Sequence, residues 1–141
     1  MRTRCLLAVL LLFSFDALVS CAPSTKQVLA TSESQLKLRA IQTRAFDTTD
    51  KEMMLRTVIA TLQDLNFIID KADDILGSVS GTKLDRYALR MTVTVRPRGE
   101  TQLLVRANAQ YEIHAVEDPE PYQQFFEALS KSVFLTAHQV E

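Results

Sequence analysis

Seven arginine or short polar residues recur at every second position along two neighbouring stretches of the 141-residue chain. Arginine presents a planar fork of donors that fits carboxylates and phosphates, and short polar residues leave room for a partner strand. If both stretches are strands, these side chains share one face. The competing interpretation is an ordinary solvated surface, which also needs charges and threonines. The candidate binding face comprises Arg90, Thr92, Thr94, Arg96, Arg106, Asn108 and Gln110.

Residues that bind metals or react covalently are scattered along the chain. His114 and His138 lie far apart with no cysteine near either, so their spacing does not fit zinc. Asp70, Asp73 and Asp74 lack the twelve-residue pattern of a calcium loop and are interpreted as solvated turn carboxylates. No nucleophile stands beside a histidine in a known motif, and three glycines make no phosphate loop. We therefore expect no metal, no cofactor and no enzymatic activity.

The chain opens with a segment typical of a secretory signal. Arg2 and Arg4 precede an apolar run that ends before Asp16, and this run is shorter than the roughly 20 apolar residues of a membrane-crossing helix. Next comes Leu18-Val19-Ser20-Cys21, which resembles the lipobox of bacterial lipoproteins: a leucine-type residue, two small residues and a cysteine. The alternative is an ordinary signal peptide with a chance cysteine.

The lipobox resemblance implies an address and a domain organisation. Residues 1–20 would be removed as a signal peptide, and the Cys21 thiol would carry a diacylglycerol on an acylated N-terminus. More than one acyl chain gives a stable anchor. Ala22, where an aspartate would favour the inner membrane, implies the outer membrane, on its periplasmic side. We expect residues 21–35 to be the lipidated cysteine and a flexible tether, and residues 36–141 to be one periplasmic domain.

The cysteine content and the net charge limit the kinds of partner expected for this domain. Cys5 would leave with the signal peptide, so no thiol remains for a disulfide and stability must come from the core. Without residues 1–20 the net charge is about −2, which gives no electrostatic reason to expect nucleic acid. The membrane, through the lipid, and envelope proteins are the expected partners.

Apolar periodicity predicts a strand and two helices. Alternation from Leu36 to Phe46 indicates a first strand. Thr49 and Glu52 have the spacing of a capping box for a first helix, and Asp118 with Pro119 begins a second helix. Each helix carries an apolar stripe: Met54, Leu55, Val58, Ile59, Leu62 and Leu65 in the first, and Tyr122, Phe125, Phe126, Leu129 and Val133 in the second.

The remaining pattern is that of antiparallel strands. Residues 67–83 form either two short strands around a turn or one bent strand. Residues 89–96 and 103–113 alternate as a hairpin, with a turn at residues 97–101 in which Gly99 takes a positive φ. Each hairpin strand has one apolar and one polar face, so we expect the sheet to be covered on one side only.

Together these elements predict an α+β fold. It is a two-layer sandwich in which an antiparallel sheet of three to four strands carries two helices on one face, in the order β-α-β-β-β-α. Splitting residues 67–83 adds one strand to this order. In outline the domain is similar to small helix-on-sheet modules in lipoprotein subunits of outer-membrane assembly and secretion machines. That resemblance covers topology and no diagnostic residue.

Two functions fit this prediction. The first is a non-catalytic protein-binding accessory or scaffold subunit of an envelope complex, with its oligomeric state left open. Phe134 and Leu135 lie off the main helical stripe and belong either to a docking patch or to the core. The second is a small-ligand or lipid-binding module in the helix/sheet interior. It requires a cavity lined by Met54, Val58, Met91, Val93 and Phe125.

Overall fold

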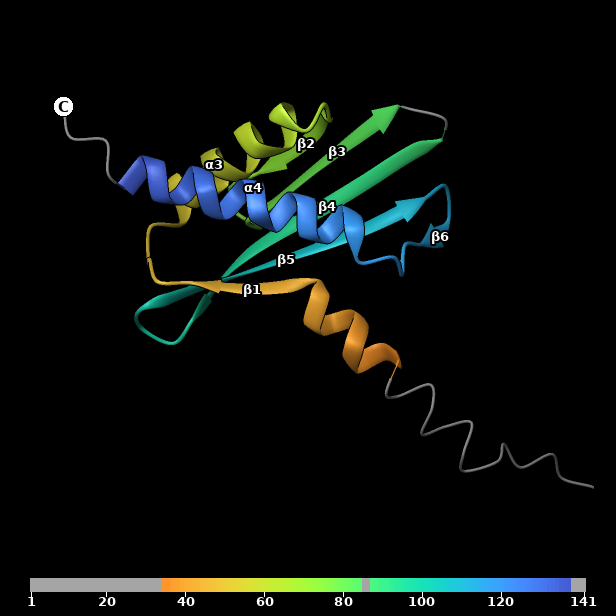
Figure 1. Ribbon diagram of the computed structural model, residues 1–141. Coiled ribbons are helices and arrows are strands. Elements are labelled where there is room, and N and C mark those ends of the chain that lie inside the picture. Colours follow the sequence, from red (N-terminus) through yellow and green to blue (C-terminus); the bar gives the residue numbers. More distant parts are fainter. Residues whose placement is uncertain (1–33, 85–86, 138–141) are drawn as a thin grey trace, which may run out of the picture. The chain divides into compact units, whose positions relative to one another are not determined.

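A computed structural model describes residues 34–84 and 87–137, which form an antiparallel sheet with helices (Figure 1). The predicted signal peptide, Cys21 and nearly all of the predicted tether lie outside these described residues. The helices of this part are residues 34–41, α3 (Lys51–Asp64) and α4 (Glu120–Ala137). The strands are β1 (Thr43–Phe46), β2 (Ile68–Asp73), β3 (Ser78–Leu84), β4 (Ala88–Arg98), β5 (Gln102–Tyr111) and β6 (His114–Ala115).

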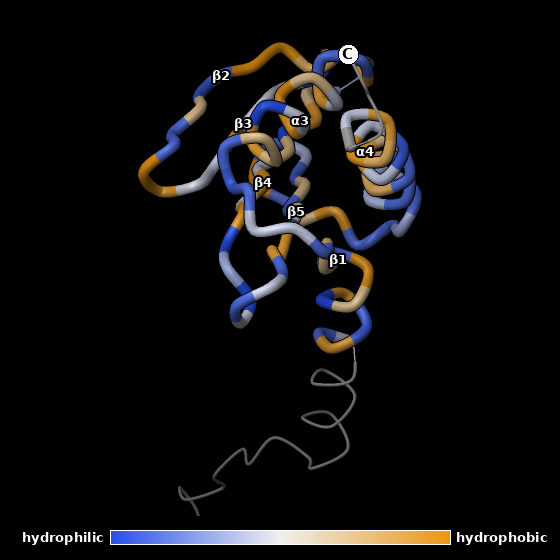
Figure 2. The backbone as a smooth tube through the Cα atoms, turned by 90° about the vertical axis from the view of Figure 1, so that its left-hand side faces the viewer, coloured by the Kyte–Doolittle hydropathy of each residue, from blue (hydrophilic) through white to orange (hydrophobic). Residues whose placement is uncertain are grey.

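The six strands make one sheet whose order is β1-β5-β4-β3-β2, and the short β6 pairs with the end of β5. All neighbouring strands are antiparallel. α3 carries the chain from β1 to β2, at the opposite end of the strand order, and contacts β2, β3 and β4 on the way. α4 contacts β5 and α3. Figure 2 shows α3 and α4 on the same side of the sheet, so neither of them covers its other face.

The α+β class and the antiparallel sheet are confirmed, but the predicted count of three to four strands is wrong. Residues 67–83 hold two strands, because a turn closes between them. In that turn Asp73 Oδ1 accepts a hydrogen bond from the Leu76 amide at 2.9 Å, and Gly77 has a φ of 65°. A Cβ on Gly77 would lie 2.6 Å from the Val95 carbonyl oxygen, so glycine is required there. The two-residue β6 adds the sixth strand.

The first half of the predicted strand at residues 36–46 is also wrong, because residues 34–41 are helical and the strand begins only at Thr43. Leu38 and Ile41 pack against the core, whereas Leu36 is exposed. Positions three apart share one side of a helix but lie on opposite faces of a strand, so the partial burial of both residues fits the helix and not the predicted alternation. The segment therefore adds a third helix, which the predicted order lacked.

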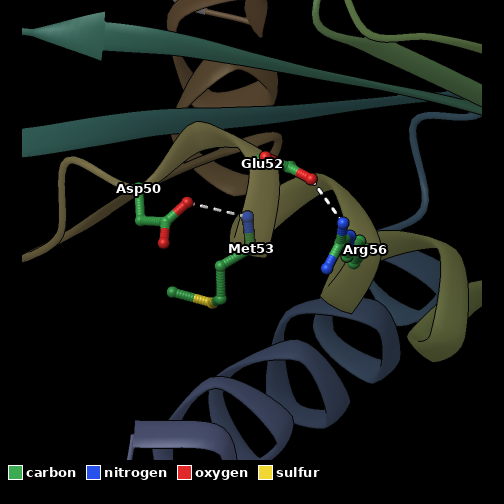
Figure 3. Close-up of polar contacts among 4 residues, drawn as sticks. All are labelled: Asp50, Glu52, Met53 and Arg56. Carbon is green, nitrogen blue, oxygen red and sulfur yellow. Dashed lines mark hydrogen bonds and ion pairs between the residues drawn. The ribbon is translucent and has the colours of Figure 1, made fainter.

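The α3 helix begins one residue later than the capping box predicted. Asp50, not Thr49, is the N-cap, and its Oδ1 accepts a hydrogen bond from the Met53 amide at 2.9 Å (Figure 3). Glu52 forms an ion pair with Arg56 along the helix instead of reaching back to the cap. At the N-cap position, an aspartate side chain accepts a hydrogen bond from the same backbone amide that a threonine side chain would.

The predicted apolar stripes and the hairpin face meet in one core. Asp118 Oδ1 accepts a hydrogen bond from the Glu120 amide at 2.9 Å, as predicted for the residue that caps the second helix. Because protein interiors are closely packed, each buried group of this core contributes to stability. The most deeply buried side chains include Met54, Val58 and Leu62 of α3, Met91, Val93 and Val95 of β4, Leu103 and Val105 of β5, and Tyr122, Phe125 and Leu129 of α4.

A buried hydroxyl joins α4 to the edge of the sheet. The Tyr122 hydroxyl donates a hydrogen bond to the Val116 carbonyl at 2.7 Å. It accepts hydrogen bonds from the Ala109 amide and from Gln42 Nε2, both at 3.2 Å. β1 pairs with the first half of β5 and β6 with its last residues, so Ala109 lies in the gap between these two partners. The Tyr122 hydroxyl thus accepts the hydrogen bond that the Ala109 amide would otherwise donate to a neighbouring strand.

We expect Tyr122→Phe to destabilise the domain strongly. The change leaves a buried amide, a buried carbonyl and a buried side-chain amide without their shared partner, and a buried unsatisfied group costs roughly 1–3 kcal/mol. The free energy of unfolding, measured by urea denaturation, should fall by at least about 2 kcal/mol. Tyr87→Phe is the matched control, because Tyr87 is 72% exposed. Equal stability of the two variants would show that the hydroxyl does not hold the helix.

Candidate binding face of the sheet

The structure brings all seven predicted residues to one face. Residues directly opposite each other on antiparallel strands point to the same side, and every second residue of a strand does so too. The helices cover the other side, which carries the core residues of β4 and β5. Arg96 follows Thr94 at the next outward position. The pairs on this open face are Arg90 with Gln110, Thr92 with Asn108, and Thr94 with Arg106.

The open face extends beyond the predicted hairpin. On one side, β3 continues it with Ser78, Ser80 and Thr82, which lie opposite Thr94, Thr92 and Arg90. On the other side, β1 places Thr43 opposite Arg106. Apolar residues also lie on this face, because Leu104 pairs with Arg96 and the exposed Ile68 pairs with Thr82. The face is therefore a row of hydroxyl groups flanked by arginines, with apolar contact points at Leu104 and Ile68.

Asp70 also belongs to this face, and the sequence analysis missed it. A bulge in β2 between Ile69 and Lys71 shifts the strand register. The Asp70 carboxylate accepts a hydrogen bond from Thr82 Oγ1 at 2.7 Å and lies 3.8 Å from Arg90 Nε. The interpretation of Asp70 as a turn carboxylate is therefore wrong. A bulge changes which side a residue faces, and no pattern in the sequence marks its position.

The charges on the open face are distributed unevenly. Arg90 has an acidic neighbour in Asp70, whereas Arg96 has no hydrogen-bond or ion-pair partner among residues 34–84 and 87–137. Arg106 Nη2 donates one long hydrogen bond, 3.4 Å, to Gln42 Oε1. Because Arg106 lies two residues from the partner of Arg96, the two arginines are diagonal neighbours, with backbones about 7–8 Å apart. Arg96 and Arg106 thus form a positive pair on the half of the face nearer the β4–β5 turn.

The structure places the other candidate groups apart. In the described segments no three His, Cys, Asp or Glu side chains gather in a way that could hold a metal. His114 is exposed at the start of β6, and His138 lies outside the described residues. Phe134 and Leu135 are exposed near the end of α4, which excludes the core as their place. Within the same described segments, no helix is both long and apolar enough to cross a membrane.

The cavity required by the second hypothesis is not where it was expected. Its five lining residues, named above, are each at most 1% exposed and belong to the core. Met91 also lines a pocket. That pocket opens at one end of the sheet, beside the core.

Comparison with known proteins does not assign a function to this surface. No protein-family model matches the chain, and no curated protein matches it. The function therefore has to be inferred from the geometry and charge of the open face.

We expect the two faces of β4 to respond differently to substitution. Val93→Ala removes buried methyl groups and should cost roughly 1–3 kcal/mol of the free energy of unfolding. Arg96→Gln, three positions along the same strand, should change it by less than about 0.5 kcal/mol, because the side chain is exposed. Thermal denaturation followed by circular dichroism measures both. Early melting of the arginine variant would contradict the assignment of the open face.

Proposed function

We propose that this protein is an outer-membrane lipoprotein on the periplasmic side, held by lipid on Cys21, whose domain is a non-catalytic protein-binding accessory or scaffold subunit of an envelope complex. The anchor rests on the resemblance of residues 18–21 to a lipobox. The binding role rests on one observation: the open face carries Arg96 and Arg106 without an acidic partner on the described residues.

The arrangement of layers supports this role. In the proposed two-layer sandwich, α3 and α4 cover one face of the sheet, and the other face is left to the partner. Hydroxyl side chains are short, so a partner's backbone can approach the strands closely. The two arginines favour an acidic segment of that partner, and Leu104 offers apolar contact between them. Charges at such a surface guide association and register more than they add affinity.

The anchor predicts a specific loss in the Cys21→Ser variant. A serine hydroxyl cannot form the thioether that carries the diacylglycerol, and cleavage depends on that lipid. We expect no incorporation of labelled palmitate and accumulation of an unprocessed precursor in the inner membrane fraction. Incorporation at the wild-type level would exclude Cys21 as the lipidated residue.

The open face predicts where a partner makes contact in cells. A photo-crosslinking amino acid at Asn108, which is exposed in the middle of the face, should form adducts with an envelope protein. The same group at Glu127, exposed on α4, is the matched control and should form none. Adding Arg96→Glu and Arg106→Glu should abolish the Asn108 adducts. Adducts from Glu127 alone, or adducts insensitive to both arginine changes, would place the interface elsewhere.

A further inference from the structure

A pocket of about 390 Å³ opens on the helix-covered side of the sheet, away from the open face. It lies where α3 ends, α4 begins and β5 ends. Figure 1 shows the end of β5 and the start of α4 at its right. Leu65, Phe67, Leu89 and Met91 provide its apolar lining. The other lining residues are Lys83, Tyr87, Tyr111, Glu120, Pro121 and Gln124.

The two helices leave this end of the sheet uncovered for local reasons. α3 ends at Asp64, and Asn66, with a φ of 65°, turns the chain away toward β2. Phe67 then packs close to Gly81, where an added Cβ would lie 3.3 Å from the Cβ of Phe67. α4 begins only at Glu120. The cross-strand row of residues that contains Leu89 therefore lies between the end of α3 and the start of α4.

Lys83 is the unusual member of this lining. It pairs with Leu89 across the β3–β4 ladder, so it points to the helix-covered side, where Val79 of β3 and Met91 and Val93 of β4 are apolar core residues. It is half-buried, and it has neither a hydrogen bond nor an ion pair with any residue that the structure describes. Glu120, at the same pocket, instead accepts a hydrogen bond from Gln124 Nε2 at 3.1 Å. A cation beside apolar surface is stabilised by an anion that reaches it.

The mouth of the pocket adds aromatic surface. The rings of Tyr87 and Tyr111 meet edge to face, with centroids 6.4 Å apart. They are 72% and 41% exposed, so their apolar faces have room for a guest. Ligand sites typically combine such an apolar lining with one or a few charged groups that orient the guest, in volumes of about 300–1,000 Å³.

We propose that this pocket binds a small amphiphile that has an aliphatic body and one carboxylate. The carboxylate pairs with the Lys83 ammonium group, and the body lies over Leu89, Met91 and the two tyrosines. This site is separate from the proposed protein-binding face, because Lys83 and its neighbour Thr82 point to opposite sides of β3. The two proposals therefore stand or fall independently.

Calorimetric titration of the full 141-residue chain with octanoate tests this site, with octanol as the neutral analogue. We expect octanoate to bind with one-to-one stoichiometry and at least about tenfold more tightly than octanol, because a hydrogen bond between two charged groups is stronger than one to a neutral hydroxyl. Lys83→Met should remove this preference and leave octanol binding unchanged. Lys131→Met, which removes an exposed lysine of α4 outside the pocket, is the matched control and should keep it.

A second variant tests the position of the apolar body. Leu89→Trp fills the pocket and should abolish binding of both octanoate and octanol, while circular dichroism shows whether the domain still folds. Failure of the wild-type chain to bind octanoate would overturn the proposal. So would equal affinity for the two compounds, or an octanoate affinity that Lys83→Met does not change.

Discussion

The hydroxyl of Tyr122 holds the two layers of this domain in place. β5 needs a hydrogen-bonding partner along its outer edge, but β1 pairs with only four of its residues and β6 with only two. Between these two strands, the Ala107 amide donates a hydrogen bond to the Gln42 carbonyl at 2.9 Å, and the Tyr122 hydroxyl accepts one from the Ala109 amide. Because Tyr122 belongs to α4, the same bonds that complete the strand edge also fix the helix against the sheet.

That constraint decides which surfaces remain for binding. With α4 fixed on one side, the outward side chains of β3, β4 and β5 stay in solvent, and the start of α4 forms one wall of the pocket. Because side chains alternate between the two sides of β3, Thr82 lies on the open face while Lys83 lines the pocket. A single antiparallel sheet thus presents two chemically different surfaces without any additional domain.

The ends of the strand order are less suited to receiving a partner than the open face. β1 has four residues, and β2 is interrupted by its bulge and carries Asp70, Lys71 and Asp73. Short, bulged and charged edge strands discourage the addition of another strand. This favours recognition through side chains of the open face, where the bulge also brings Asp70 toward Arg90 and leaves the positive charge at the Arg96 end.

The sequence by itself determined the features that depend on near neighbours. The stripes of α3 and α4, the alternation of the β4–β5 hairpin, the positive φ of Gly99 and the Asp118 cap all follow from spacing within a few residues. The lipobox at Cys21 stays a prediction of the same local kind. Tertiary structure alone decided the helix at residues 34–41, the outward turn of Asp70, the role of the Tyr122 hydroxyl and the exposure of Lys83 to a pocket. Each of these depends on a partner distant in the chain, and local periodicity carries no information about such partners.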